Sequence, residues 1–320
     1  MIERCFPSTD GSVIWYTDRG GDAADSGGRA NAAPTLVFYH GIFESRRAFA
    51  KIADAVAART GWRCVTVDLR GHGRSRADGG TFTPRQYAED IEALLVHLAG
   101  ESDSVGQGGY VLSGYSLGSY MVMNYLKEFG FARVRGLVLM DWSPKTLSDA
   151  DWTLGLMRGA YGRAELRRDL AWIADEATFY KFLANFVYHS VKMPQARGYK
   201  ARPPLWARVA SHFICENTAE TRGHLERLWG AFEEADYRAL AERIDVPTLL
   251  ICAVPGSLFV PEAGDYLKER IGETARLVRV GGEGFFGVTH HALPEQRRVL
   301  AREIVAFLAA PDVLHSGKSV

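Results

Sequence analysis

The chain has 320 residues, and its 38 Lys and Arg balance its 38 Asp and Glu, so the formal net charge is zero. This balance argues against a basic surface for nucleic acid or acidic lipid, and 47% hydrophobic residues is ordinary globular composition. No apolar run is long enough to span a membrane, and the first residues lack the apolar core of a secretion signal. We therefore expect a cytoplasmic protein with no nucleic-acid or membrane partner.

Short apolar segments rich in β-branched residues alternate with helical patterns along the chain. Before residue 143, strands are expected at 12–17, 35–39, 64–67, 109–113 and 135–140, and helices at 46–59, 84–98 and 117–128. After residue 244, strands are expected at 247–253 and 275–280, and a helix at 294–309. This alternation predicts an α/β fold with a mostly parallel central sheet and helices on both faces.

The segment 143–244 differs from the rest because its strand pattern stops and its sequence becomes helical and dense in aromatic residues. Two parts of one core, 1–142 and 245–310, flank it, and the tail 311–320 is expected to be disordered. We interpret 143–244 as an inserted helical lid. Its aromatic residues are expected to form the lid's own core and to line part of a substrate cavity: Trp152, Tyr161, Trp172, Phe179, Tyr180, Phe182, Phe186, Tyr188, Trp206 and Trp229.

Residues 114–118 read Gly-Tyr-Ser-Leu-Gly between an expected strand and an expected helix. A G-x-S-x-G pentapeptide in that context predicts a nucleophile elbow, with Ser116 presented at the start of the helix. Gly114 and Gly118 leave room for the sharp turn. The unpaired N–H groups at the helix start favour negative charge, so the N–H of Leu117 is the expected first donor to an oxyanion.

A second loop, Phe-Tyr-His-Gly-Ile-Phe-Glu at 38–44, follows another expected strand. The N–H of Ile42 is the candidate second oxyanion donor. His40 is expected chiefly to hold this loop by hydrogen bonds, and it is also a candidate substrate contact together with Tyr115 and Trp142. The Gly-rich turn at 68–75 has no phosphate-loop spacing and is interpreted as structural.

With these motifs, the chain resembles the α/β-hydrolase superfamily over nearly its whole length. The resemblance rests on His40-Gly41, the turn 68–75, the pentapeptide 114–118, the helical insertion and a His near the end of the chain. It implies a catalytic Ser, acid and His in that chain order. The base is then expected in the loop after the last strand. His290 is preferred because family members place the base about as far ahead of the core Phe of the final helix as His290 lies from Phe307, and His291 is the alternative.

The acid departs from the pattern of many family members, which carry an Asp four residues before a Pro after the seventh strand. The corresponding residue here is Ser257, which has no charge to stabilise an imidazolium. Some family members carry the acid after the sixth strand instead, and Asp141 ends that strand here. Asp141 is therefore the expected acid, with Glu262 and Asp265 as weaker candidates.

These residues together predict a serine hydrolase that cleaves an ester or lactone of an apolar small molecule through an acyl-enzyme, without metal or organic cofactor. Asp141-Trp142 and Thr289-His290 also resemble cofactor-free 2,4-dioxygenases of the same fold, which use a His/Asp pair. Hydrolysis of a carbon–carbon bond and a non-catalytic ligand-binding role are further alternatives. A homodimer is left open.

Overall fold

The computed structural model describes residues 1–20, 33–76, 80, 82–100, 108–191, 204–282, 287–291, 293–310 and 313. The segment 20–34, which its Gly, Ala, Asp and Ser content predicts to be a connection without regular structure, lies mostly outside these residues, as does most of the tail 311–320. In the part of the chain that is described, no helix is both long and apolar enough to cross a membrane.

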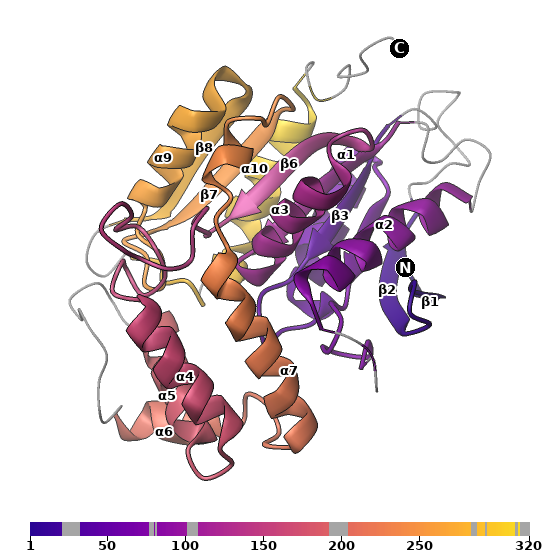
Figure 1. Cartoon of the computed structure of the whole chain (residues 1–320). Coiled ribbons are helices and arrows are strands. Elements are labelled where there is room, and N and C mark those ends of the chain that lie inside the picture. The colour runs from indigo at the N-terminus through magenta and orange to yellow at the C-terminus, as the bar shows by residue number, and fades with distance from the viewer. Residues whose placement is uncertain are drawn as a thin grey trace.

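Eight strands form one sheet in the order β1-β2-β4-β3-β5-β6-β7-β8 (Figure 1). Pairing is antiparallel from β1 to β2 and from β2 to β4, and parallel across the rest of the sheet. The expected mostly parallel sheet is therefore confirmed. The strands are β1 (Ile2–Pro7), β2 (Val13–Arg19), β3 (Thr35–Tyr39), β4 (Cys64–Val67), β5 (Tyr110–Tyr115), β6 (Val134–Met140), β7 (Thr248–Val254) and β8 (Ala275–Gly281).

The strand β1 is the one element of the sheet that the sequence pattern did not predict. All of its residues except Phe6 are exposed, so it lacks the apolar alternation of a half-buried strand. It lies at the edge of the sheet and pairs only with β2, in a register that joins Ile2 to Asp18 and Pro7 to Val13. Pairing with an existing strand, rather than its own pattern, forms β1.

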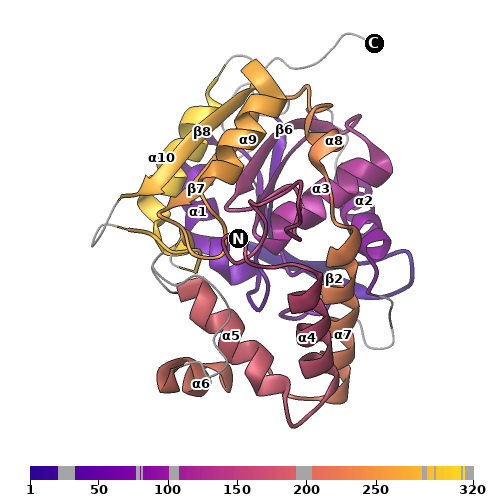
Figure 2. The same ribbon diagram turned by 60° about the vertical axis from the view of Figure 1, so that its left-hand side comes forward.

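Helices cover both faces of the sheet, as predicted (Figures 1 and 2). On one face, α2 (Pro84–Gly100), α3 (Leu117–Phe129) and α9 (Glu262–Ile271) pack into one apolar cluster with the strands. On the other, α1 (Ala50–Thr60), which follows the short 3-10 helix η2 (Arg46–Phe49), packs with α10 (Arg297–Leu308) into a second cluster. The central strands β3 to β7 lie between the two clusters and are almost entirely buried, and their carboxyl ends lie at one edge of the sheet.

Between β6 and β7 the chain leaves the sheet and forms a helical unit beyond the carboxyl ends of the strands (Figures 1 and 2). Its helices are α4 (Arg163–Ala174), α5 (Phe179–Val191), α6 (Leu205–Ser211) and α7 (Ala219–Gly230). The short α8 (Arg238–Ala241) follows and lies back beside the sheet, where Leu240 and Ala241 join the apolar cluster of α2 and α3 (Figure 2). The described residues of this unit include isolated bridges but no strand. Tyr161, Phe179, Phe182 and Trp229 are buried in a separate apolar cluster of this unit, so much of its aromatic content is internal packing.

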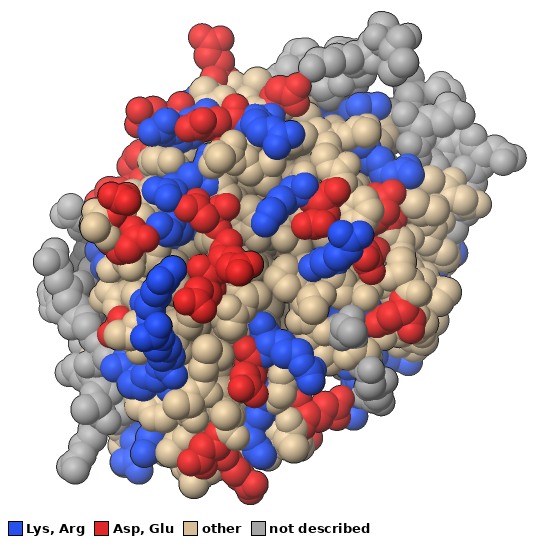
Figure 3. All heavy atoms as spheres, in the orientation of Figure 1, with Lys and Arg blue, Asp and Glu red and all other residues tan. Residues whose placement is uncertain are grey.

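Charge is spread evenly over the face of the molecule seen in Figure 3, where acidic and basic side chains are interspersed. The turn 68–75 is structural, as the sequence suggested. The carboxylate of Asp68 accepts hydrogen bonds from the N–H groups of Arg46 and Arg74 at 2.7 and 2.9 Å. The Arg70 guanidinium is fully buried and pairs with Asp10 and Asp90.

Candidate active site

Ser116 lies at the sharp turn between β5 and α3, the place that the pentapeptide predicted. Its backbone adopts φ 52° and ψ −115°, a strained conformation for a residue with a side chain. A Cβ at Gly118 would overlap the carbonyl oxygen of Tyr39, and one at Gly114 would overlap the backbone of Ser119. Both glycines are therefore required for β5, α3 and the β3 loop to approach so closely.

The imidazole of His290 lies against Ser116, although the two residues are far apart in the sequence. His290 Nε2 is 2.9 Å from Ser116 Oγ, and the His290 side chain is 4% exposed. His291 is exposed, and its backbone N–H donates to the carbonyl of Ser190 at 3.2 Å. The geometry therefore favours His290, rather than His291, as the partner of Ser116.

Asp141, directly after β6, supplies the carboxylate that faces this imidazole. Its Oδ2 accepts a hydrogen bond from His290 Nδ1 at 2.5 Å, and its Oδ1 accepts one from the N–H of Ala253 at 3.0 Å. The other candidate acids lie elsewhere, because Glu262 begins α9 and Asp265 pairs with Arg279. The structure thus brings Ser116, His290 and Asp141 into one hydrogen-bonded line.

Contacts to its ring and its main chain also hold His290 in place. Ser257 Oγ accepts a hydrogen bond from the His290 N–H at 2.9 Å, and the Tyr115 hydroxyl donates to the His290 carbonyl at 2.7 Å. The imidazole stacks on the Tyr115 ring and meets the edge of Phe259, with centroid distances of 4.9 and 5.6 Å. Burial raises the pKa of the Tyr115 hydroxyl well above its ordinary value, so it remains a donor.

The Ser116 hydroxyl opens into a small apolar cavity of about 40 Å³. Ile42 and Leu117, the two expected oxyanion donors, line it together with Trp142. Leu117 is the first residue of α3, so its N–H has no acceptor four residues earlier within the helix. The remaining lining residues come mostly from the helical unit and the loop after β7: Tyr120, Thr146, Leu156, Phe186, Trp229, Phe232, Leu258 and Phe259.

Two of the expected substrate contacts do not line this cavity. His40 is fully buried and lies outside this cavity, with Nδ1 2.7 Å from the Gly41 carbonyl and Nε2 accepting the Leu69 N–H at 3.1 Å. Burial lowers its pKa to about 3, so it is a neutral residue that holds the loop. Tyr115 is 2% exposed and packs behind His290. Both side chains therefore stabilise the site from outside the cavity: His40 holds the loop 38–44, and Tyr115 packs against the His290 ring.

Comparison with known proteins agrees with this geometry. The family model described as "alpha/beta hydrolase fold" matches residues 34–291. The chain belongs to the α/β-hydrolase family. The expected membership is thereby confirmed, and with it the assignment as a hydrolase.

Similar proteins differ in the activities that their names state. A pimeloyl-(acyl-carrier protein) methyl ester esterase of Neisseria meningitidis is 28% identical over 78% of this chain and 70% of its own length. A non-heme haloperoxidase of Rhodococcus erythropolis is 27% identical over 76% of this chain and 78% of its own. The solved structure of an esterase from Exiguobacterium antarcticum has a TM-score of 0.69 at 18% identity, covering 96% of this chain and 99% of that one. That structural similarity supports the fold.

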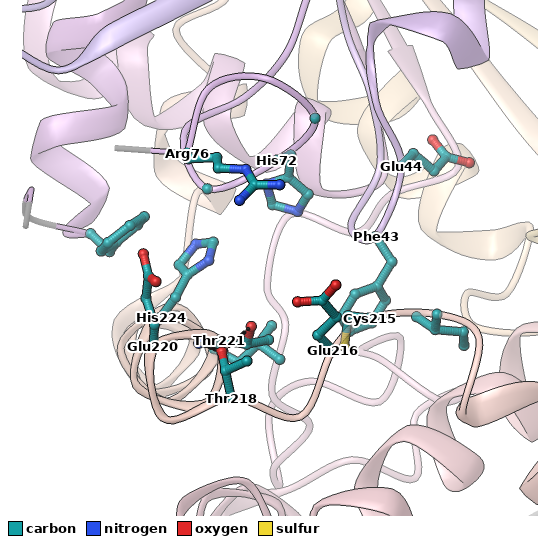
Figure 4. Close-up of a pocket in the computed structure, with 15 residues that line it drawn as sticks. Phe43, Glu44, His72, Arg76, Cys215, Glu216, Thr218, Glu220, Thr221 and His224 are labelled. Carbon is teal, nitrogen blue, oxygen red and sulfur yellow. Dashed lines mark hydrogen bonds between the residues drawn. The ribbon is translucent and has the colours of Figure 1, made fainter. Parts of the chain in front are cut away.

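This α/β-hydrolase has a second, larger cavity of about 350 Å³ that sequence analysis did not predict. It lies between the turn 68–75 and the start of α7, where Figure 4 shows Arg76 and His72 facing Thr221 and His224. Its polar lining contrasts with that of the cavity at Ser116. No contiguous sequence motif could have revealed it, because its walls come from segments about 150 residues apart, as the pair His72 and His224 shows.

Phe43 forms part of the wall between the two cavities of the α/β-hydrolase. Its neighbour Ile42 lines the small cavity, whereas Phe43 itself lines the large one. The Phe43 ring meets the edge of Phe186, a lining residue of the small cavity, at a centroid distance of 5.3 Å. Phe43 has φ 62°, a left-handed conformation that costs energy for a bulky residue.

Glu44, the next residue, is a half-buried acid beside the site. Its carboxylate accepts a hydrogen bond from the Gly41 N–H at 2.9 Å and is turned away from the large cavity in Figure 4. Burial raises its pKa to about 7, although the Gly41 hydrogen bond and the nearby His290 act in the opposite direction. A carboxyl group this close to the oxyanion loop therefore changes charge near neutral pH.

Proposed function

We propose that this protein is a serine esterase that acts through Ser116, His290 and Asp141. One observation carries the proposal. The His290 ring is hydrogen-bonded through Nδ1 to a buried carboxylate, and its Nε2 lies 2.9 Å from the hydroxyl group of a serine in the strained turn of a nucleophile elbow. This is the arrangement by which a base activates a hydroxyl group for attack on a carbonyl carbon. The esterases among the similar proteins support ester hydrolysis as the reaction.

In the proposed mechanism, Ser116 Oγ attacks the ester carbonyl while His290 Nε2 takes its proton. The N–H groups of Ile42 and Leu117 stabilise the oxyanion. Asp141 holds the Nδ1–H tautomer and balances the charge of the imidazolium. His290 then protonates the departing alcohol, and in the second half it activates the water that releases the acid from Ser116.

The lining of the cavity at Ser116 supports an apolar acyl group as the portion bound there. Nine of its lining side chains are aliphatic or aromatic hydrocarbons or Trp: Ile42, Leu117, Trp142, Leu156, Phe186, Trp229, Phe232, Leu258 and Phe259. The cavity of about 40 Å³ admits only a few carbon atoms in this conformation. We therefore propose short-chain esters as substrates, and we propose that the helical unit acts as a lid whose movement admits them.

Two measurements test the proposal together. p-Nitrophenyl esters from acetate to decanoate would be assayed with the wild type and Ser116→Ala, and the wild type would be treated with a fluorophosphonate and its labelled peptide located. We expect hydrolysis that is fastest for the short esters, lost in Ser116→Ala, and labelling at Ser116. If the folded wild type neither hydrolyses esters nor becomes labelled, but consumes oxygen with a hydroxy-quinolone, the protein is a His/Asp dioxygenase instead.

A further inference from the structure

Ser257 stands where many family members carry the catalytic acid, and its hydroxyl group joins two other segments. Ser257 is 3% exposed. Its Oγ accepts a hydrogen bond from the His290 N–H at 2.9 Å and donates one to the Ser190 carbonyl at 2.8 Å. The hydroxyl group therefore lies between the loop that carries His290 and the end of α5 in the helical unit.

The Ser190 carbonyl receives a second hydrogen bond from the same loop. The His291 N–H donates to it at 3.2 Å. Ser190 is the last residue but one of α5, and the carbonyl groups in the last turn of a helix have no N–H donor four residues later within the helix. The end of α5 is thus attached to the His290 loop by two adjacent hydrogen bonds, one of them through Ser257.

We propose that Ser257 is a positioning residue that couples α5 to the main chain of His290. The inference rests on the proposed function, because it assigns the Ser257 hydroxyl a role in aligning the base of that reaction. Asp141 orients the His290 ring, whereas Ser257 fixes its backbone only while α5 lies against the loop. Departure of α5 removes the acceptor of the Ser257 hydroxyl and of the His291 N–H, so alignment of the base is complete only with the helical unit closed.

The two hydrogen bonds of Ser257 explain why a serine, and not an acid, suits this position. A carboxylate at this position would accept the His290 N–H but could not donate to the Ser190 carbonyl. It would also place a second negative charge near Asp141. A hydroxyl group alone both donates and accepts, so it can bridge an N–H and a carbonyl.

The first test compares Ser257→Ala and Ser257→Cys with the matched control Ser113→Ala. Cys conserves the side-chain volume but is a weak hydrogen-bonding partner, and Ser113 is a buried serine whose hydroxyl group has no partner among the described residues. We expect kcat and the rate of fluorophosphonate labelling at Ser116 to fall together by about 10- to 100-fold in both Ser257 variants, with KM changed less than about threefold. The Ser113→Ala variant should retain wild-type rates.

The second test measures coupling to the helical unit by hydrogen–deuterium exchange of the same variants at equal temperature. We expect faster exchange in the peptides that cover the end of α5 and in those that cover 287–291, and no change in Ser113→Ala. Wild-type labelling rates in both folded Ser257 variants would overturn the positioning role, and faster exchange in the His290 loop alone would overturn the coupling to α5. A wild type that is inert to esters and to fluorophosphonate is a different result, because it refutes the proposed function itself.

Discussion

Asp141 accepts a hydrogen bond from His290 Nδ1 at 2.5 Å, although 149 positions separate the two residues in the chain. Asp141 follows β6, and the His290 loop follows β8, with β7 between the two strands. The carboxylate is oriented by a second hydrogen bond, from the N–H of Ala253 at the end of β7. Asp141 therefore reaches His290 across the edge of the sheet, while Ser257, at the position where many family members carry an acid, binds the His290 main chain.

Replacing Asp141 with Asn should lower kcat by about 10³- to 10⁴-fold, because the neutral amide no longer holds the productive tautomer or balances the imidazolium. The Asn carbonyl oxygen can still accept the N–H of Ala253, so the variant should fold. Steady-state kinetics and thermal unfolding would be measured beside Glu262→Gln, which removes a carboxylate at the start of α9. Equal activity in the two variants would show that Asp141 is not the acid.

The two adjacent histidines should give unequal losses when each is replaced with Ala. His290→Ala removes the group beside Ser116 and should lower kcat/KM by at least about 10³-fold. His291→Ala retains the backbone N–H that binds Ser190 and removes only an exposed ring, so kcat/KM should stay within about threefold of the wild type. The reverse order of losses would transfer the role of base to His291.

Removing the Phe43 ring should extend the range of acyl chains that are hydrolysed. Phe43→Ala opens the wall between the cavities of about 40 and 350 Å³. The backbone strain at φ 62° remains in part, because Ala still carries a Cβ. We expect kcat/KM for octanoate relative to acetate to rise by about tenfold. Phe232→Ala enlarges the small cavity without joining it to the larger one, so its effect on octanoate should be smaller. An unchanged preference in Phe43→Ala would show that the two cavities stay separate.

The half-buried carboxyl group of Glu44 should make folding stability depend on pH. Its pKa is about 7 in the folded protein against 4.5 ordinarily, so the folded state binds more protons between these values. The free energy of unfolding should therefore fall as pH rises from about 4.5 to about 7 and then level off. Urea unfolding should show Glu44→Gln more stable than the wild type by about 1–3 kcal/mol at pH 8 and equal to it at pH 4. A Gln variant that gains nothing at pH 8, like the exposed control Glu233→Gln, would contradict this burial effect.

The predicted fold agrees with the structure wherever an element carries its own pattern. The strands at 35–39, 64–67 and 135–140 were predictable because they are apolar and buried on both faces. The strand β1 was not, since its exposed residues carry no periodic signal and only β2 holds it in the sheet. The same limit applies to the large cavity, whose walls come from distant segments.

The sequence by itself determined the nucleophile elbow and the order of strands and helices that surrounds it. The motif is contiguous: a strand, two glycines around Ser116 and a helix follow one another in the chain. The turn therefore depends on neighbouring residues and can be predicted from them. Only the tertiary structure showed that the His290 ring, rather than that of His291, faces Ser116, because the direction of two adjacent side chains depends on how the loop meets the sheet. It likewise showed that His40 and Tyr115 are buried and do not line the cavity at Ser116, and that Ser257 has two hydrogen-bond partners. Those contacts join segments that pack together only after the sheet has brought its strand ends to one edge.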